Sequence, residues 1–307
     1  MSSASSTIAA SRPFALRTPR ISAQAALGLL FVLVWSSGYV AGKIALTHGA
    51  AFTLLVLRFA GAALIFALLA LAARASWPSL RQSGHSVVVG LLSLALQFGG
   101  IYLGVQLGAE VGVAALLVGS MPLLTAALAP LIGERVTARA WLGLALGLGG
   151  VVLVLADRIG FGGAGPGAYG LLLLGLVGIS IGTLYQKRFA TAIDMRVGLT
   201  IQHAAAALVL LPCAFAENFR QDATLAYLGS LGWLIAVNSV GGFALLFVLL
   251  RRGQASRVAQ LFFLIPPVTA VLGLLFLGEN FSVLKLLGFA LAALGVYLGT
   301  RPLRATA

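Results

Sequence analysis

An arginine inside a long apolar stretch is the residue of this sequence with the clearest capacity for chemistry. Arg58 lies between the segments LLVL and FAGAALIF. A charge is costly in an apolar medium, so such a side chain faces the interior of a helix bundle or a water-filled cavity. Two interpretations remain open. Arg58 binds an anion or a carboxylate there, or it holds backbone carbonyls of neighbouring helices together.

Polar and aromatic side chains inside the other apolar stretches are further candidates for binding a small molecule. Trp35 and Tyr39 are four residues apart and therefore share one face of a helix, with Ser36 beside them. Alternatively, Tyr39 anchors a helix end at the membrane interface, Ser36 serves close helix packing, and Gln260 cross-links two helices. The candidate substrate-binding residues are Trp35, Ser36, Tyr39, Arg58, Gln97, Tyr102, Thr183, Asn238, Gln260 and Phe263.

Histidine and proline supply two further kinds of candidate. His203 lies inside an apolar stretch and its side chain titrates near neutral pH, so it is a candidate for proton coupling. The alternative is a neutral imidazole that is hydrogen-bonded to a neighbouring helix. Proline removes a backbone donor and interrupts a helix. Pro122, Pro266 and Pro267 are therefore candidate hinges, or else kinks that fit the packing.

The acidic residues lie at the ends of the apolar stretches. For Glu110, Glu134, Asp157 and Glu279 we expect solvated or turn-capping roles. Their position argues against a carboxylate relay, and the sequence contains neither an HExxH motif nor a G-x-x-x-x-G-K-[ST] loop. A single cysteine, Cys213, excludes an internal disulfide and a cysteine metal site. We therefore expect no catalytic residue, no metal, no cofactor and no enzymatic activity.

The composition indicates that lipid is the main solvent of this chain. Hydrophobic residues make up 60% of it, charged residues 9%, and the mean hydropathy is +1.06. A soluble domain carries about 25% charged residues. The net charge of +13 raises the question of nucleic acid. However, the basic residues are scattered between apolar stretches and form no patch, so we expect no nucleic-acid partner.

Ten apolar stretches are long enough to cross a bilayer as helices, which takes roughly 17–25 residues. They are too continuous for the alternating strands of a barrel, so we predict an all-α integral membrane protein. Their approximate limits are 23–46, 50–73, 86–107, 110–132, 138–156, 167–187, 195–216, 225–250, 254–277 and 283–300.

The second part of the chain repeats the first. Residues 113–153 resemble residues 258–298 without a gap, and a fixed offset of this kind indicates an internal duplication. A weaker match continues the duplication backward and places Gln202 opposite Arg58. The predicted organisation is a tail at 1–22, a five-helix repeat at 23–157, a linker at 158–166, a second five-helix repeat at 167–300 and a tail at 301–307.

Lysine and arginine predict the orientation. Most of the 20 basic residues fall in the N-terminal tail and in every second connection, and positive charge of this kind stays in the cytoplasm. We therefore expect both termini in the cytoplasm, with the chain in the inner membrane of the cell. Each repeat has five helices, an odd number, so the second repeat is inverted. Inverted repeats are typical of secondary transporters, which bind substrate near the midplane.

The chain resembles EamA-type members of the drug/metabolite transporter superfamily. The resemblance covers about residues 22–302. It rests on VLVWSSGYVAGKIAL at 32–46, LLVLRFAGAALIF at 54–66, and two P-x10-GE turns, each followed by a helix of Leu, Ala and spaced Gly. It implies ten helices, cytoplasmic termini, alternating access and the export of amino acids or other small metabolites.

The leading hypothesis is a secondary-active or facilitative exporter of small metabolites, with amino acids as one class. An exchanger of nucleotide sugars or phosphorylated metabolites is the alternative within the superfamily. An integral-membrane enzyme or a scaffold is the alternative of another class. The expected partners are a small-molecule substrate and membrane lipid, and the chain is expected to be a monomer or a homodimer.

Overall fold

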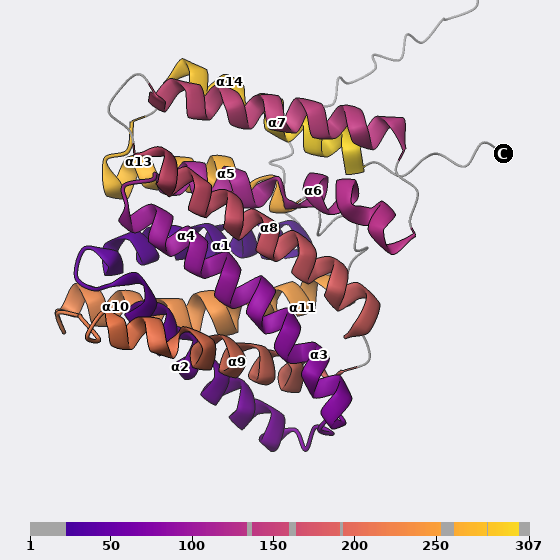
Figure 1. The fold of residues 1–307 in the computed structure, drawn as a ribbon, viewed down its shortest axis with the longest axis vertical. Coiled ribbons are helices and arrows are strands. Elements are labelled where there is room, and N and C mark those ends of the chain that lie inside the picture. The colour runs from indigo at the N-terminus through magenta and orange to yellow at the C-terminus, as the bar shows by residue number, and fades with distance from the viewer. Residues whose placement is uncertain are drawn as a thin grey trace, which may run out of the picture.

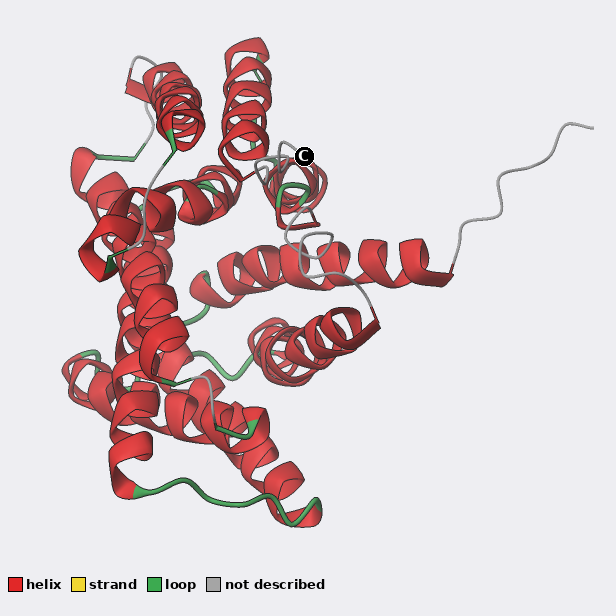
Figure 2. Ribbon diagram, turned by 90° about the vertical axis from the view of Figure 1, so that its right-hand side faces the viewer, coloured by secondary structure: helices red, strands yellow, loops and turns green. Residues whose placement is uncertain are grey.

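The chain folds into a bundle of helices. The computed structural model describes residues 23–133, 137–159, 164–190, 193–252, 261–280 and 282–300. The regular secondary structure of these residues is helical, apart from one isolated bridge between Gly49 and Gln221, and loops connect the helices (Figure 2). The predicted all-α class is therefore confirmed.

The apolar stretches of the sequence correspond to long helices. The α-helices are α1 (Ala23–Leu46), α2 (Ala51–Ala72), α3 (Leu80–Gly90), α4 (Gln97–Gln106), α5 (Val111–Gly119), α6 (Met121–Leu128), α7 (Ala138–Ile159), α8 (Pro166–Phe189), α9 (Met195–Ala216), α10 (Leu225–Gly232), α11 (Gly242–Arg252), α13 (Ile265–Leu277) and α14 (Val283–Thr300). Three short segments continue these helices: the π-helical η1 (Leu91–Leu96) and η3 (Trp233–Gly241), and the 3₁₀-helical η2 (Ala129–Ile132).

The protein is a multi-pass membrane protein. Among the described residues, seven helices are long and apolar enough to cross a membrane, and three shorter apolar helices accompany them. Large apolar side chains such as Leu64, Leu208 and Leu275 are exposed on the outside of the bundle. An apolar surface of this extent is stable in contact with lipid tails.

One helix begins earlier than the sequence predicts. The third apolar stretch suggests a start near residue 86, but α3 begins at Leu80. Ser79 and Gln82 form a capping box there, in which the Ser79 side chain accepts from Gln82 N and the Gln82 side chain accepts from Ser79 N. This reciprocal cap satisfies two orphan donors and extends the helix into its polar flank.

Helices far apart in the sequence pack in pairs. Figure 1 shows α7 and α14 side by side at one edge of the bundle, with α2 and α9 at the opposite edge. Glycine permits the closest approach between α7 and α14, since a Cβ at Gly150 would lie 2.5 Å from the Gly288 carbonyl oxygen. In the same way α4 packs against α8, and α5 against α13.

The three candidate hinge prolines lie at helix starts. Pro122 is in the first turn of α6, after a break at Ser120, and Pro266 and Pro267 are in the first turn of α13. A proline is tolerated at such a position because the N–H that it lacks has no partner in the helix. The predicted interruptions are present, and they take the form of new helix starts.

Several connections meet at one end of the bundle, which we term the loop end. It contains residues 47–50, 107–110, 217–224 and 278–280. Ala50 N donates to Arg220 O at 2.9 Å, and Asp222 N donates to His48 O at 2.7 Å. Ala51 N donates to the Gln106 side chain at 2.8 Å. These contacts join the first three connections, and Glu279 joins residues 278–280 to the start of α5 by accepting from Val111 N.

Candidate functional site

The buried side chain of Arg58 is the centre of a polar cluster. Arg58 lies on α2 and is 3% exposed. Its Nη1 donates to Tyr102 Oη at 2.7 Å, its Nη2 to Asn238 Oδ1 at 2.7 Å, and its Nε to Ser239 Oγ at 3.2 Å. The Phe98 ring centre lies 4.6 Å from the guanidinium carbon. We term these five residues the Arg58 cluster. It joins α2, α4 and η3.

The guanidinium of Arg58 is a positive charge that is held by neutral groups. Within the described part of the chain, its hydrogen-bond partners are two hydroxyls and an amide oxygen. These bonds use three of its five N–H groups, which leaves two for a ligand. Buried charges are normally paired, and weak screening in the interior strengthens their attraction to an opposite charge. The arrangement is therefore suited to binding a carboxylate or another small anion.

Two glycines on α1 provide the space for the Arg58 cluster. Gly38 and Gly42 are four residues apart and share one face of the helix. A Cβ at Gly42 would lie 2.8 Å from Tyr102 Oη, and a Cβ at Gly38 would overlap the amide of Asn238. A larger residue at either position would separate α1 from the cluster. The glycine face of α1 is therefore one wall of the site.

Asn238 connects Arg58 to the backbone of α1. Its Nδ2 donates to Val34 O at 3.1 Å and to Trp35 O at 3.4 Å, while its Oδ1 accepts from Arg58. Carbonyl oxygens only accept hydrogen bonds, so the pattern fixes the amide with its oxygen toward the guanidinium. Asn238 thereby positions Arg58 relative to α1.

A π-helical segment supplies two members of the cluster. Asn238 and Ser239 are consecutive residues of η3, and both reach Arg58. Consecutive side chains of an α-helix do not face the same neighbour. A π-helical turn contains more residues than an α-helical turn, so consecutive side chains point in more similar directions. Such turns are frequent at functional sites. Gln97, which is 5% exposed, directly follows the other π-helical segment, η1.

Trp35 lies outside the cluster, among other aromatic rings. Its ring centre is 5.3 Å from that of Phe31, 5.7 Å from that of Phe243 and 5.6 Å from that of Phe262. Edge-to-face and tilted arrangements at these distances stabilise an apolar core. Trp35 touches the Arg58 cluster through its backbone carbonyl, which accepts from Asn238.

Other candidates make contacts of their own. Ser36 Oγ donates to Ile265 O at 3.3 Å, and Thr183 Oγ1 lies 3.7 Å from the sulfur of Met121. Tyr39 is partly buried and packs between two apolar clusters. These bonds join α1 to α13 and α8 to α6. The structure therefore does not bring these three side chains into the hydrogen bonds around Arg58.

Phe263 lines a small cavity between α5, α13 and α14. The cavity has a volume of about 20 Å³, and Ser120 and Pro266 also line it. A water molecule needs about 10–15 Å³. The cavity is therefore too small for an amino acid in this conformation. Gln260, the neighbouring candidate in the sequence, lies outside the described residues.

His203 is enclosed by aromatic rings. Its ring centre lies 5.7 Å from that of Phe59, 5.3 Å from that of Phe66 and 6.1 Å from that of Phe243. Its Nδ1 is 2.8 Å from Leu199 O, and a carbonyl oxygen only accepts. This contact assigns the proton to Nδ1 and leaves Nε2 without it in the neutral ring.

Three of the ten predicted binding residues, Arg58, Tyr102 and Asn238, therefore meet directly. Two members of the cluster, Phe98 and Ser239, were not among the predicted site residues. Phe98 is one of 17 phenylalanines, and no local pattern distinguishes it. Ser239 is adjacent to a predicted residue, but the α-helical spacing on which sequence reasoning depends places consecutive residues on different faces.

Long apolar helices around a buried charge are features expected of a membrane transporter for a small molecule. Comparison with known proteins supports this class. The model of the EamA-like transporter family matches residues 23–156 and 167–301. The chain belongs to this family, and its function is transport rather than enzymatic catalysis.

The relatives are also named as transporters. The chain is 26% identical over 284 residues to an uncharacterized inner membrane transporter of Escherichia coli, YedA, covering 89% of this chain and 90% of YedA. It is 24% identical over 283 residues to a "probable amino-acid metabolite efflux pump" of Salmonella typhimurium, covering 89% and 93%. One crystal structure matches with a TM-score of 0.64 at 22% identity, over 94% of this chain and 100% of that one, which shows a shared fold.

Proposed function

We propose that this chain exports small metabolites that carry a carboxylate, with amino acids as the first class to test, by alternating access across the inner membrane. Arg58 binds the carboxylate, while Tyr102, Asn238 and Ser239 hold the guanidinium in place. The observation that carries the proposal is a buried guanidinium that has neutral partners, and two N–H groups without a partner, among the described residues. The name of the Salmonella relative supports the substrate class.

The remaining candidates are proposed to contact other parts of the substrate. Trp35 and Tyr39 lie on α1, the helix that carries the glycine wall, and Gln97 begins α4, which carries Tyr102. In this proposal, these three side chains contact the rest of the substrate when the site opens. Ser36, Thr183, Gln260 and Phe263 are secondary candidates.

Two inverted five-helix repeats, at 23–157 and 167–300, provide the architecture for alternating access in this proposal. The packing is consistent with such a repeat. An offset of 144 or 145 residues relates α2 to α9, α7 to α14 and η1 to η3, and the first two pairs pack together. The family model also matches each proposed repeat separately.

The loop end faces away from the cytoplasm in this proposal, and both termini face the cytoplasm. The basic residues Arg74, Lys187, Arg188 and Arg196 lie at the helix ends opposite the loop end. Positive charge that flanks membrane helices is retained in the cytoplasm. His203 is the candidate for proton coupling, and the helix starts at Pro122 and Pro266–Pro267 are the candidate hinges.

Proteoliposomes provide the test. The purified protein is reconstituted, the vesicles are loaded with pooled amino acids, and mass spectrometry identifies what leaves, with and without a pH gradient. We expect Arg58→Gln and Arg58→Lys to lower efflux by about 30-fold or more, because breaking a buried hydrogen-bonded charge pair costs about 2–5 kcal/mol. Lysine retains the charge but lacks the planar fork of arginine.

Lys43→Gln is the matched control for these variants. Lys43 is a cation at the end of α1 that donates to Val105 O at 3.0 Å, outside the Arg58 cluster. We expect its removal to leave efflux near the native rate. If Arg58→Gln transports normally per folded molecule and loses only thermal stability, Arg58 is structural and the proposal is wrong.

A further inference from the structure

At the loop end, a carboxylate on the segment after α13 caps the first turn of α5. Glu279 Oε1 accepts from Val111 N at 2.7 Å, and Oε2 accepts from Gly112 N at 3.4 Å. A helix N-terminus carries a partial positive charge and unpaired N–H groups, so it binds a carboxylate well. A Cβ at Gly273 would lie 2.6 Å from Oε2, so glycine at this position gives the carboxylate its space.

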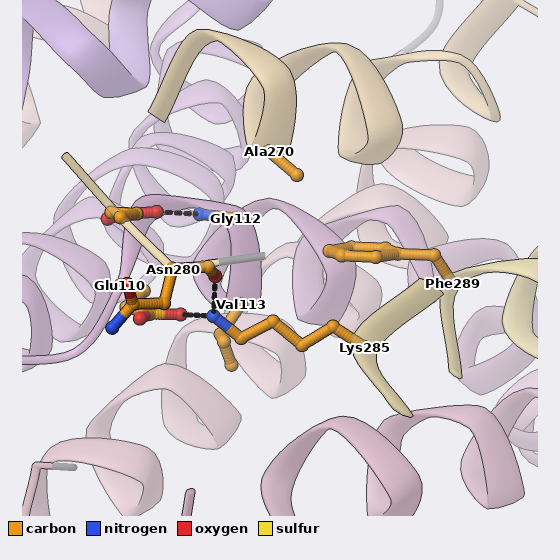
Figure 3. A pocket seen from close by; sticks show the side chains of 8 residues that line it. Glu110, Gly112, Val113, Ala270, Asn280, Lys285 and Phe289 are labelled. Atoms are coloured by element: carbon orange, nitrogen blue, oxygen red, sulfur yellow. Dashed lines mark hydrogen bonds and ion pairs between the residues drawn. The ribbon is translucent and has the colours of Figure 1, made fainter. Parts of the chain in front are cut away.

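An ion pair crosses the same contact. Lys285 on α14 is 3% exposed and pairs with Glu110, the residue just before α5. Its Nζ also donates to Asn280 O. Figure 3 shows the Lys285 ammonium directed at Glu110 and Asn280. Glu279 and Lys285 thus hold the start of α5 in place, and Asn280 helps to position Lys285.

The space inside this contact is closed to a metabolite. Glu110, Gly112, Ala270 and Glu279 are among the residues that line a cavity of about 10 Å³ (Figure 3). That volume corresponds to about one water molecule. A substrate that leaves between α5 and α13 at the loop end must therefore separate these residues first.

The contact holds two carboxylates and one cation. The titratable groups that face Glu279 in the described residues are Glu110, before α5, and Lys285, on α14. Lys285 pairs directly with Glu110. Among the described residues, the hydrogen-bond donors to the Glu279 side chain are the backbone amides of Val111 and Gly112, and Glu279 lies beside a carboxylate of like charge. Burial raises the pKa of Glu279 above its usual value, and the charge of Glu110 raises it further, against the hydrogen bonds from α5 and the charge of Lys285.

From this geometry we propose that Glu279 is a proton-binding site whose occupation closes a loop-end gate formed by Glu279, Glu110 and Lys285. The proposal rests on the alternating access proposed above. The proton neutralises the buried carboxylate beside Glu110, and the neutral acid still accepts from Val111 N through its carbonyl oxygen. Loss of the proton leaves a charge that is more stable in water, which favours the open state.

The direction in which pH shifts the gate follows from the thermodynamic linkage between proton binding and closure. A state that binds a proton more tightly is favoured at low pH. Because the pKa of Glu279 is raised in the closed contact, closure gains stability as pH falls and loses it as pH rises through that pKa. In an exporter, proton uptake from the side that receives the substrate would then close the gate after release.

Cysteine labelling tests the gate without any knowledge of the substrate. Cys213→Ser removes the native thiol, and Ala270→Cys places a new thiol in the lining of the closed cavity. The protein is held in lipid nanodiscs, which expose both faces to a polar maleimide. Labelling rates are divided by those of Gln221→Cys, an exposed loop-end position, to correct for the pH dependence of the thiol itself.

We expect the corrected rate to fall by roughly fivefold or more between about pH 7.5 and about pH 5.5, a coupling typical of linked sites. In Glu279→Gln, which imitates the neutral acid, the rate should be low and independent of pH. Glu217→Gln is the matched control, because Glu217 caps the start of α2 at the same end through Phe52 N and Thr53 N. It should keep the native response.

Further variants separate this proposal from its rivals. Glu110→Gln removes the like charge and should move the response to lower pH. His203→Gln tests the other candidate for proton binding: a pH response that disappears in His203→Gln and persists in Glu279→Gln would assign the proton to His203. A flat native response, or a native response in Glu279→Gln, would overturn the gate. If the response follows Glu279 but no amino acid is transported, the gate stands and the proposed substrate class is wrong.

Discussion

The structure contains two places where a glycine of a long helix meets a polar residue of a π-helical segment. At the first, Gly38 of α1 lies against Asn238 of η3, and at the second, Gly182 of α8 lies against Ser93 of η1. Asn238 is hydrogen-bonded to Arg58. Ser93 Oγ is buried and has no hydrogen-bond partner among the described residues. The backbone arrangement is therefore shared, while a charge is held at only one of the two places.

This difference indicates how a duplicated scaffold becomes an asymmetric site. Close packing of helices needs a small residue and a widened turn, and both places have them. Binding an anion needs in addition a cation that the surroundings do not neutralise. The duplicated sequence places Gln202 opposite Arg58, so at this position only the first repeat has a charged side chain. We expect transport to depend on the first place and folding to depend on both.

The largest effect on transport is expected when a negative charge is introduced beside Arg58, at the contact between Gly38 and Asn238. Asn238→Asp puts a carboxylate against the Arg58 guanidinium, where the two pair and the site no longer attracts an anion. Efflux per folded molecule in proteoliposomes should fall by about 30-fold or more. The new carboxylate gains Arg58 as a partner but cannot donate to Val34 O and Trp35 O as the Asn238 amide does, so the variant should also lose some thermal stability. Native efflux by Asn238→Asp would contradict the anion site.

An aspartate at the second place, the contact between Gly182 and Ser93, tests the same comparison. Ser93→Asp introduces a carboxylate where Ser93 Oγ lacks a partner among the described residues. An unpaired buried charge is strongly destabilising. Size-exclusion chromatography should therefore show a larger loss of folded protein for Ser93→Asp than for Asn238→Asp, because only the carboxylate at position 238 has Arg58 as a partner. Equal profiles would mean that the two places do not differ in charge.

Glycine substitutions should give an intermediate effect. A Cβ at Gly38 would overlap Asn238, and a Cβ at Gly182 would overlap Ser93 Oγ. Overpacking of this kind costs about 1–3 kcal/mol. Both alanine variants should lower the thermal unfolding temperature, but only Gly38→Ala should also lower efflux per folded molecule. Gly170→Ala is the control, because a Cβ there meets nothing within 4 Å.

Much of this arrangement could be predicted from the sequence. The apolar stretch at 23–46 is α1, and the stretch at 50–73 closely matches α2. Arg58 was singled out because a charge in an apolar run has few favourable places to lie. Its meeting with Asn238 could not be predicted, because 180 residues separate the two in the chain. A contact at that distance depends on helix packing, which leaves no local pattern.

Other features had no sequence signal at all. The π-helical turns of η1 and η3 lie in apolar runs whose composition also suits an α-helix. Trp35 was expected in the cavity wall on the same evidence as Tyr39, yet its ring packs against Phe31 and Phe262. Aromatic side chains at helical spacing serve a core or a binding site equally well, and only the neighbouring helices decide between them.

The smallest expected effect is on stability, from the helix cap at Asp194. Asp194 caps α9 at the end opposite the loop end, and the Arg196 side chain holds the pKa of this carboxyl below its usual value. Such a group stabilises the fold above its ordinary pKa and loses the contribution as pH falls through the lowered one. Asp194 is partly exposed, so Asp194→Asn should cost only about 0.5–1 kcal/mol in thermal unfolding at neutral pH.

Acidification should therefore act on the two ends in opposite directions. The loop end gains from a proton on Glu279, whereas the opposite end loses the cap at Asp194 only at strongly acidic pH. Hydrogen exchange of the backbone amides, measured at about pH 7.5 and about pH 5.5, should show slower exchange at Val111 and no change at Arg196 after correction for intrinsic rates. Faster exchange at Val111 on acidification would contradict this contrast.

The most direct measurement compares an amino acid with its carboxamide as substrates of the native protein and of Arg58→Gln. Proteoliposomes are loaded with both compounds, and the ratio of their efflux rates is followed by mass spectrometry. If Arg58 binds the carboxylate, the native protein should prefer the amino acid by about 30-fold or more, and Arg58→Gln should lose nearly all of that preference. An unchanged preference in Arg58→Gln would show that the carboxylate is bound elsewhere.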